Sequence, residues 1–374
     1  MGGGTSSPRF GLEKNIYLVV LLLGITPMDA TSIIEKLEKE LERAHSFNKV
    51  FSKRFSKNPS KAIREGLART ARITKRFSRF FRSQDFGKLD DFFFSRKTLL
   101  PGAKEYWFIN LVSTSGDRTQ LILTFGSSDL KTKVNKQVAP EGKVAAVGWL
   151  YSGKKKVFLE KSISLESKKG LLKTSEFEFR GAYPSFGLTA GEGTRIRFSK
   201  PRHGISFETL NHFVSSLGVG ILNYYLDAHG TVDGKKFSGA GYVQKVLVVA
   251  PFIPWNWVRL VFADRSVLDV FVAKLDFYSL GYDIHHSATY RASSGRTVKL
   301  RDTQIRKLAG ERWLLEGRDF SAYMKTYASY PFVFRGKGEF HYDEYLVECE
   351  DFAFKGESKK SGIGIVEDAY GFMI

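Results

Sequence analysis

The chain has 374 residues, 43% of them hydrophobic, so it is longer than one hydrophobic core usually supports, and we expect two or three domains. Aromatic residues make up 14% of it beside 35 Gly, which favours strands and tight turns over a helical bundle. The net charge of +19 is concentrated in residues 43–82, where thirteen Lys or Arg stand against the single acid Glu65. This concentration predicts an anionic partner for that segment. The single cysteine, Cys349, excludes an internal disulfide and is typical of a reducing compartment.

An apolar run, IYLVVLLLGI, occupies residues 16–25, after Arg9 and Lys14 and before Pro27. It is too short to span a bilayer. Met28 and Ala30 form a poor signal-cleavage pair, so we favour a segment docked on the protein or in an interface over a secretion signal. An anchor or signal role stays open as an alternative.

Two helices are predicted within residues 1–87. The first begins after Asp29, and the second begins at Asn58 and Pro59, which suit the N-cap and the first helical position. In the second helix, apolar residues recur at helical spacing from Ile63 to Phe80, and basic residues fill the other faces. A basic amphipathic helix of this kind is typical of an anionic membrane surface. Packing on the protein itself and nucleic-acid binding are the alternatives. The residues expected at the membrane surface are Arg64, Arg72, Lys75, Arg76, Phe77, Arg79 and Phe80.

After Gln84 the hydrophobic pattern changes to a period of two. Short segments rich in aromatic and β-branched residues, such as EYWFINLVST and WNWVRLVF, are separated by turn residues. No long helical pattern interrupts them, so parallel βαβ layers are not expected. We predict a mainly β fold with two tandem antiparallel barrels, over residues 88–204 and 205–374. The glycine-rich stretch at residues 187–194 lacks the Gly-Lys-Ser/Thr ending of a phosphate loop and is predicted to be a hairpin turn.

The segment GAGYVQKVLVVAPFIPWNWVRL at residues 239–260 resembles a motif of the tocopherol cyclase and carotenoid 1,2-hydratase group, which includes hydroxyneurosporene synthase and AttH-like proteins. The C-terminal SGIGIVEDAYG, with Gly362, Gly364 and Glu367, is similar to the closing strand of that group. The resemblance implies two lipocalin-like barrels that hold an isoprenoid or another lipid. Trp255 and Trp257 alternate on one strand face and are predicted to line a cavity of the second barrel; an ordinary packed core is the alternative. The predicted ligand-binding residues are Tyr225, Tyr242, Phe252, Trp255 and Trp257.

The chain departs from the group at the position where those enzymes carry an acid. Gln244 stands there, and it cannot protonate a double bond, a step that needs a carboxylic acid with a raised pKa. Asp227 with His229, and Asp283 with His285, are two residues apart within predicted strands and are the candidate replacements. The alternative is that they line a barrel mouth. A metal site would require both pairs to converge, and we expect no metal and no cofactor.

Three functions follow from these patterns. The first is binding of a hydrophobic isoprenoid or lipid in a barrel, at an anionic membrane surface. The second is an isoprenoid cyclase or hydratase that protonates a double bond with a relocated acid, Asp227 or Asp283. The third is a nucleic-acid-binding or scaffold protein whose barrels are purely structural. The first predicts a cytoplasmic, peripherally membrane-associated protein, with secretion as the alternative.

Overall fold

The computed structural model describes residues 103–128, 132–135, 137–139, 144–153, 155–161, 166–168, 170–209, 218–249, 254–277, 280–336, 338–355, 357–359 and 361–373. The predicted apolar run, the basic amphipathic helix and its membrane-surface residues lie outside these ranges. Throughout the described part the chain forms strands and turns, and it contains no helix long and apolar enough to cross a membrane.

The described residues form 23 strands. In chain order they are β1 (Ala103–Ser113), β2 (Gln120–Ser128), β3 (Thr132–Val134), β4 (Gln137–Ala139), β5 (Val144–Ser152), β6 (Lys155–Lys161), β7 (Glu166–Lys168), β8 (Leu171–Lys173), β9 (Phe177–Ala182), β10 (Ser185–Ala190), β11 (Thr194–Thr209), β12 (Gly218–Val232), β13 (Lys235–Val249), β14 (Trp255–Phe262), β15 (Val267–Phe277), β16 (Leu280–Arg291), β17 (Thr297–Lys299), β18 (Gln304–Leu308), β19 (Arg312–Gly317), β20 (Phe320–Gly336), β21 (Gly338–Phe354), β22 (Glu357–Lys359) and β23 (Gly362–Met373).

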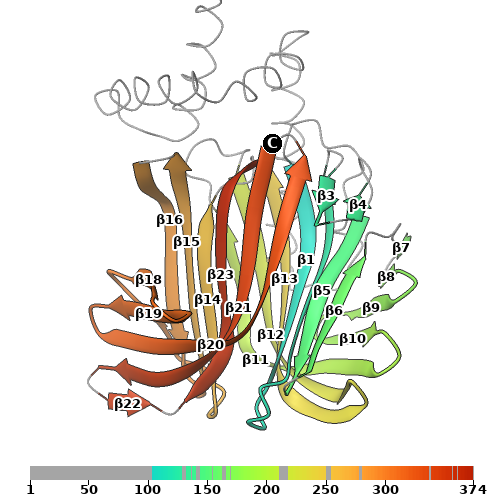
Figure 1. The fold of residues 1–374 in the computed structure, drawn as a ribbon. Helices are drawn as coiled ribbons and strands as arrows, with labels where there is room; N and C mark the ends of the chain where they lie inside the picture. Colours follow the sequence, from blue (N-terminus) through green and yellow to red (C-terminus); the bar gives the residue numbers. More distant parts are fainter. Residues whose placement is uncertain are drawn as a thin grey trace, which may run out of the picture.

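These strands build two curled antiparallel sheets, so the prediction of a mainly β fold with two antiparallel units is confirmed (Figure 1). The first sheet has the order β6-β5-β2-β1-β13-β12-β11-β10-β9-β8-β7, and the second has β17-β16-β15-β14-β23-β21-β20-β19-β18. Within the described residues the end strands of these orders do not pair with each other, so each sheet is a half-barrel. Strand β3, although it follows β2 in the chain, pairs with β20 of the second sheet.

The chain passes from the first sheet to the second between β13 and β14, near residue 250, and not at residue 204. Residue 204 lies within β11, which pairs with β12 in the first sheet. Strands β12 and β13, which we had assigned to the second barrel, therefore complete the first sheet. The reason is that residues 239–249 of β13 also pair with the whole of β1, and this long-range pairing leaves no trace in the local sequence pattern.

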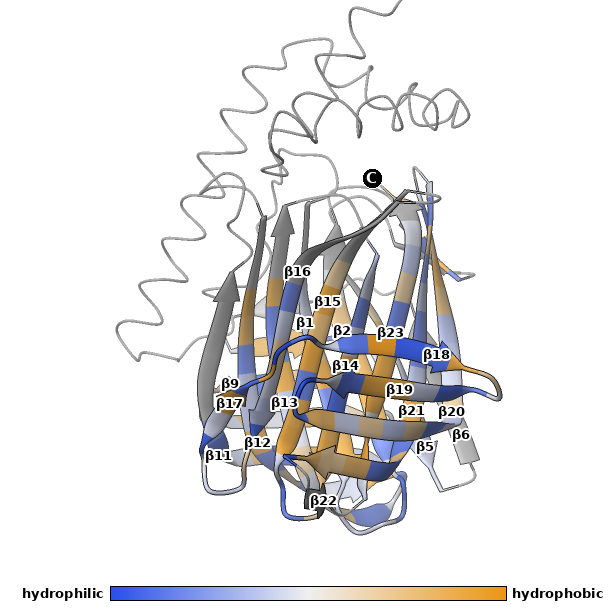
Figure 2. Ribbon diagram, turned by 90° about the vertical axis from the view of Figure 1, so that its left-hand side faces the viewer, coloured by the Kyte–Doolittle hydropathy of each residue, from blue (hydrophilic) through white to orange (hydrophobic). Residues whose placement is uncertain are grey.

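The central strands are buried on both faces. In β14, Val258, Leu260 and Phe262 belong to the core enclosed by the second sheet. The alternate residues Trp257 and Val261 pack against the first sheet. Figure 2 shows hydrophobic residues along β15 and β19 of the second sheet and the hydrophilic β18 at its edge. We call the buried layer between the two sheets the intersheet interface; its apolar residues include Phe108, Val112 and Ile122 of the first sheet and Val261, Leu346 and Ile365 of the second.

Candidate functional site

The intersheet interface contains most of the predicted site residues that the structure describes. Trp255 and Trp257 lie on the same face of β14, but this face turns toward the first sheet and not into the core of the second. The Trp257 ring packs 5.4 Å from the ring of Phe108 and 5.5 Å from that of Tyr242. Trp255 and Trp257 therefore lie between the two sheets and do not line a cavity inside the second sheet as predicted. Alternation puts the two tryptophans together but cannot tell which face is inward when both are buried.

The middle of the interface is a hydrogen-bonded network. Tyr225 of the first sheet donates to Asp269 of the second at 2.9 Å, and the Trp257 indole donates to the same carboxylate at 2.6 Å. Tyr242 donates to Asn223 at 2.6 Å and accepts a hydrogen bond from Gln244 at 2.7 Å. These contacts fix Tyr225, Tyr242 and Trp257 in place. Gln244 contributes an amide to this network and not a carboxylic acid.

Asp227 lies in this interface, beside the turn between β14 and β15. Two arginines bind its carboxylate, and we call this contact the arginine clamp. Its carboxylate accepts hydrogen bonds from Arg202 at 2.6 and 3.0 Å and from Arg265 at 2.6 Å. Burial alone would raise the pKa of Asp227, but the hydrogen bond and charge of Arg202, together with Arg265, hold this pKa below its usual value. An acid kept ionised in this way is unsuited to protonate carbon. His229 is exposed, with Nδ1 3.2 Å from Ser238 Oγ, and does not orient the Asp227 carboxyl.

Removing this clamp should affect stability. We expect Asp227→Asn to lower the free energy of unfolding by about 2 kcal/mol at pH 7, because two guanidinium groups lose their common buried partner. Since the folded pKa is depressed, the wild-type advantage should disappear as the pH falls through the carboxyl range. Urea unfolding at pH 7 and at pH 3 measures both effects. An equal loss at the two pH values would contradict the ion-pair explanation.

Also in this interface, Glu344 of β21 and Glu367 of β23, which is also the cross-strand partner of Trp257, form what we call the glutamate pair. The two residues are direct cross-strand partners, and both are buried, with 1% and 5% of their surface exposed. The Trp149 indole of the first sheet donates to Glu344 Oε2. Glu367 accepts from the Trp255 indole at 2.9 Å and from the Tyr342 hydroxyl at 2.5 Å. Among the described residues, no Lys, Arg or His forms an ion pair with either carboxyl.

Burial is the main reason why the pKa values of both carboxyls are raised. Burial and, after it, the charge of Glu367 raise the pKa of Glu344 to about 8, although hydrogen bonding by Trp149 and Tyr342 opposes this. Burial also raises the pKa of Glu367 to about 7, although the hydrogen bonds from Tyr342 and Trp255 oppose this and the charge of Asp269 supports it. Both carboxyls are thus shifted toward their protonated forms, and near neutral pH the pair holds at least one proton.

Aromatic rings surround the glutamate pair. Trp255 packs 5.2 Å from Phe340 and 5.6 Å from Tyr342, and Trp149 packs 6.0 Å from Tyr330. Burial and the Glu367 charge also raise the pKa of Tyr106 of β1. Trp255, Tyr342, Tyr330 and Tyr106 are only partly buried. The carboxyls are thus shielded from water by rings that are themselves partly exposed.

This arrangement suits a proton donor in an apolar setting. A protonated carboxyl beside an ionised or half-ionised one can give a proton on one side and accept one on the other. We had not selected Glu344 from the sequence, and Glu367 was quoted only for its place in the closing strand. The available signal was an acid on an apolar strand face: Glu344 is two residues from Tyr342 and Leu346, and Glu367 is two from Ile365 and Ala369.

Three predicted site residues remain undescribed in whole or in part. Phe252 lies outside the described ranges, and the side chains of Asp283 and His285 are not described. The backbone of β16 pairs with β15 through His285 and Asp283, with a register irregularity between them. In the described part of the chain, no group of three or more His, Cys, Asp and Glu side chains is arranged to hold a metal ion.

No protein-family model matches the chain, and no curated protein matches it in sequence. Three solved structures are similar to it in fold. A protein assigned as AttH from Nitrosomonas europaea is 13% identical with a TM-score of 0.45, over 71% of this chain and 92% of its own. Kievitone hydratase from Nectria haematococca is 11% identical with a TM-score of 0.41, over 72% and 89%. CghA, solved with Sch210972, is 11% identical with a TM-score of 0.43, over 72% and 88%. At these values the similarity concerns the fold, and it does not bear on the tocopherol cyclase part of the expected resemblance.

Proposed function

We propose that this protein binds a hydrophobic, unsaturated ligand beside the glutamate pair and protonates one of its carbon–carbon double bonds. The observation that carries the proposal is the pairing of Glu344 directly opposite Glu367 on a buried face, with indole and phenol donors and, in the described part of the chain, no cation paired with either carboxyl. Like charges placed opposite each other destabilise a sheet, and buried carboxylates without a cation are costly. Such a pair holds at least one proton at neutral pH, which makes it a carboxylic acid in an apolar environment.

The donor set supports a division of roles within the pair. Glu367 accepts hydrogen bonds on both oxygens, which favours its ionised form. Glu344 accepts the Trp149 indole on one oxygen, and burial together with the charge of Glu367 raises its pKa, which favours its protonated form. We assign Glu344 as the acid and Glu367 as the base.

In the proposed step the Glu344 proton transfers to an alkene carbon, the π electrons form the new C–H bond, and a carbocation results. Water adds to the cation and loses a proton to the Glu367 carboxylate, which gives a hydrated product. Alternatively, Glu367 removes a proton from a neighbouring carbon, which gives an isomer or a cyclised product. Aromatic faces stabilise a nearby cation, and the surrounding Trp255, Tyr342 and Tyr330 offer such faces.

An isoprenoid fits this chemistry because its isolated double bonds yield tertiary cations and its surface is apolar. The basic segment at residues 43–82 supports the further proposal that the protein works at an anionic membrane surface, where such ligands are found. A carrier without catalysis is the second candidate. It shares the ligand but not the proton transfer.

Deuterium incorporation separates the two candidates. Full-length protein is titrated with geranylgeraniol while intrinsic tryptophan fluorescence is followed, because Trp149, Trp255 and Trp257 all lie in the interface. The mixture is then incubated in D2O and the lipid is analysed by mass spectrometry. We expect a fluorescence change and the appearance of carbon-bound deuterium. A fluorescence change without deuterium would contradict catalysis on this ligand and favour the carrier.

A further inference from the structure

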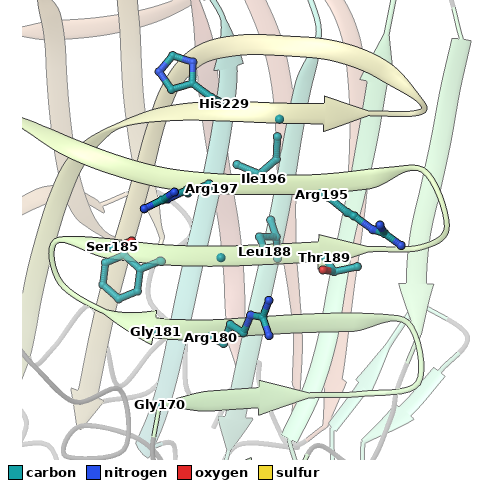
Figure 3. Close-up of a pocket in the computed structure, with 13 residues that line it drawn as sticks. Gly170, Arg180, Gly181, Ser185, Leu188, Thr189, Arg195, Ile196, Arg197 and His229 are labelled. Carbon is teal, nitrogen blue, oxygen red and sulfur yellow. The ribbon is translucent and has the colours of Figure 1, made fainter.

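A second candidate site lies on the outer surface of the first sheet, away from the glutamate pair. Strands β9, β10, β11 and β12 form an open groove lined by Arg180, Arg195, Arg197 and His229 (Figure 3). It includes the first part of the glycine-rich stretch at residues 187–194, which forms the β10–β11 hairpin as predicted. His229, which we had considered a catalytic partner of Asp227, belongs to this groove.

Glycine forms the floor between two of the arginines. Gly187 of β10 is the direct cross-strand partner of Arg197 on one side and of Arg180 on the other. A Cβ atom at Gly187 would lie 3.6 Å from Nε of Arg180, so this side chain already lies across the glycine. Arg180 and Arg197 therefore flank a position without a side chain, on strands whose backbones are about 9–10 Å apart.

The positive charge of this groove is largely uncompensated. None of its lining residues is acidic. Glu178 lies 3.6 Å from Arg180 and is shared with Lys173 at 3.5 Å. Among the described residues, no ion pair involves Arg195 or Arg197. Arginines gathered on neighbouring strands repel each other, so this arrangement weakens the folded state unless an anion binds there.

We propose that this groove binds a phosphate group. Arginine offers a planar fork of N–H donors that matches phosphate oxygens, and two forks on either side of a glycine floor can hold one phosphate between them. Arg195, two residues from Arg197 on β11, adds a third guanidinium, and the hydroxyls of Ser185 and Thr189 line the same groove. The phosphate belongs either to a soluble compound or to a lipid headgroup, and the two sources can be separated experimentally.

The test uses full-length protein, the variants Arg197→Gln and Arg180→Gln, and the control Arg312→Gln, an exposed arginine of β19 in the other sheet. One arm titrates inorganic phosphate by calorimetry. The other measures binding to phosphatidylcholine vesicles containing 10% phosphatidic acid. We expect each groove variant to bind about tenfold or more weakly in at least one arm, with the control within about twofold of wild type. Arg197→Lys, which keeps the charge but not the fork, should give an intermediate loss.

A loss confined to the phosphate arm identifies a soluble ligand, and a loss confined to the vesicle arm identifies a headgroup. Because the basic segment at residues 43–82 is present in every variant, its contribution to vesicle binding cancels between them. Unchanged binding of both groove variants in both arms, or an equal loss in Arg312→Gln, would overturn the proposal. The altered side chains are exposed, and removing one arginine relieves repulsion, so without phosphate the groove variants should melt at or slightly above the temperature of the wild type.

Discussion

Replacing Glu344 by Gln is expected to slow deuterium incorporation into a bound isoprenoid by about 100-fold or more, the usual contribution of a general acid. Glutamine keeps an oxygen that can accept the Trp149 indole hydrogen bond but has no proton to give. Glu367→Gln should also reduce the rate, because the base is lost. In the wild type the rate should fall as the pH rises above about 8, where Glu344 loses its proton.

Two substitutions serve as controls for this prediction. Glu350→Gln changes an exposed acid on the same strand, β21, and Gln244→Ala changes the position at which the sequence resemblance places an acid. Both should keep a rate within a few-fold of wild type. If Glu344→Gln and Glu367→Gln retain the wild-type rate while Asp227→Asn abolishes it, the acid is Asp227 and the assignment made here is wrong.

The glutamate pair should also make folding stability depend on pH. The pKa of Glu344 rises from an ordinary value of 4.5 to about 8, so between these values the folded state binds more protons than the unfolded chain. The free energy of unfolding therefore falls as the pH increases across this window. At about 1.4 kcal/mol per pKa unit, the loss from Glu344 is on the order of 3–5 kcal/mol between pH 5 and pH 8.

Denaturant unfolding of the wild type and of Glu344→Gln at pH 5 and pH 8 measures this effect. The variant carries no titrating group at this position, so its stability should change less with pH than that of the wild type, with the dependence due to Glu367 remaining, and should exceed that of the wild type at pH 8. Glu350→Gln should keep the wild-type dependence, because Glu350 is exposed. A wild-type protein equally stable at the two pH values would contradict a buried, proton-holding pair.

The local sequence predicted the strands well because their pattern is local. The segments EYWFINLVST, WNWVRLVF and GEFHYDEYLVECEDFAF all lie within strands or reach one residue beyond them. The predicted hairpin after β10 is also present. Their side chains alternate between two faces, and Trp255 and Trp257 share one face as alternation requires. The division into domains was less predictable, because it depends on β13 pairing with β1, which lies more than a hundred residues earlier.

The sequence by itself determined that this is a mainly β chain with strands of alternating faces, a basic segment near the N-terminus and a Gln at position 244 in place of the expected acid. Only the tertiary structure decided which strand face encloses a core and which meets the other sheet, because both faces of β14 and β21 are apolar enough to be buried. It also decided which acids matter. Asp227 is held by two arginines that the local sequence does not place beside it. Glu344 and Glu367, 23 residues apart in sequence, become direct neighbours through the β21–β23 register. Proximity to cations or to apolar rings sets the pKa of a carboxyl, and that proximity is a property of the fold.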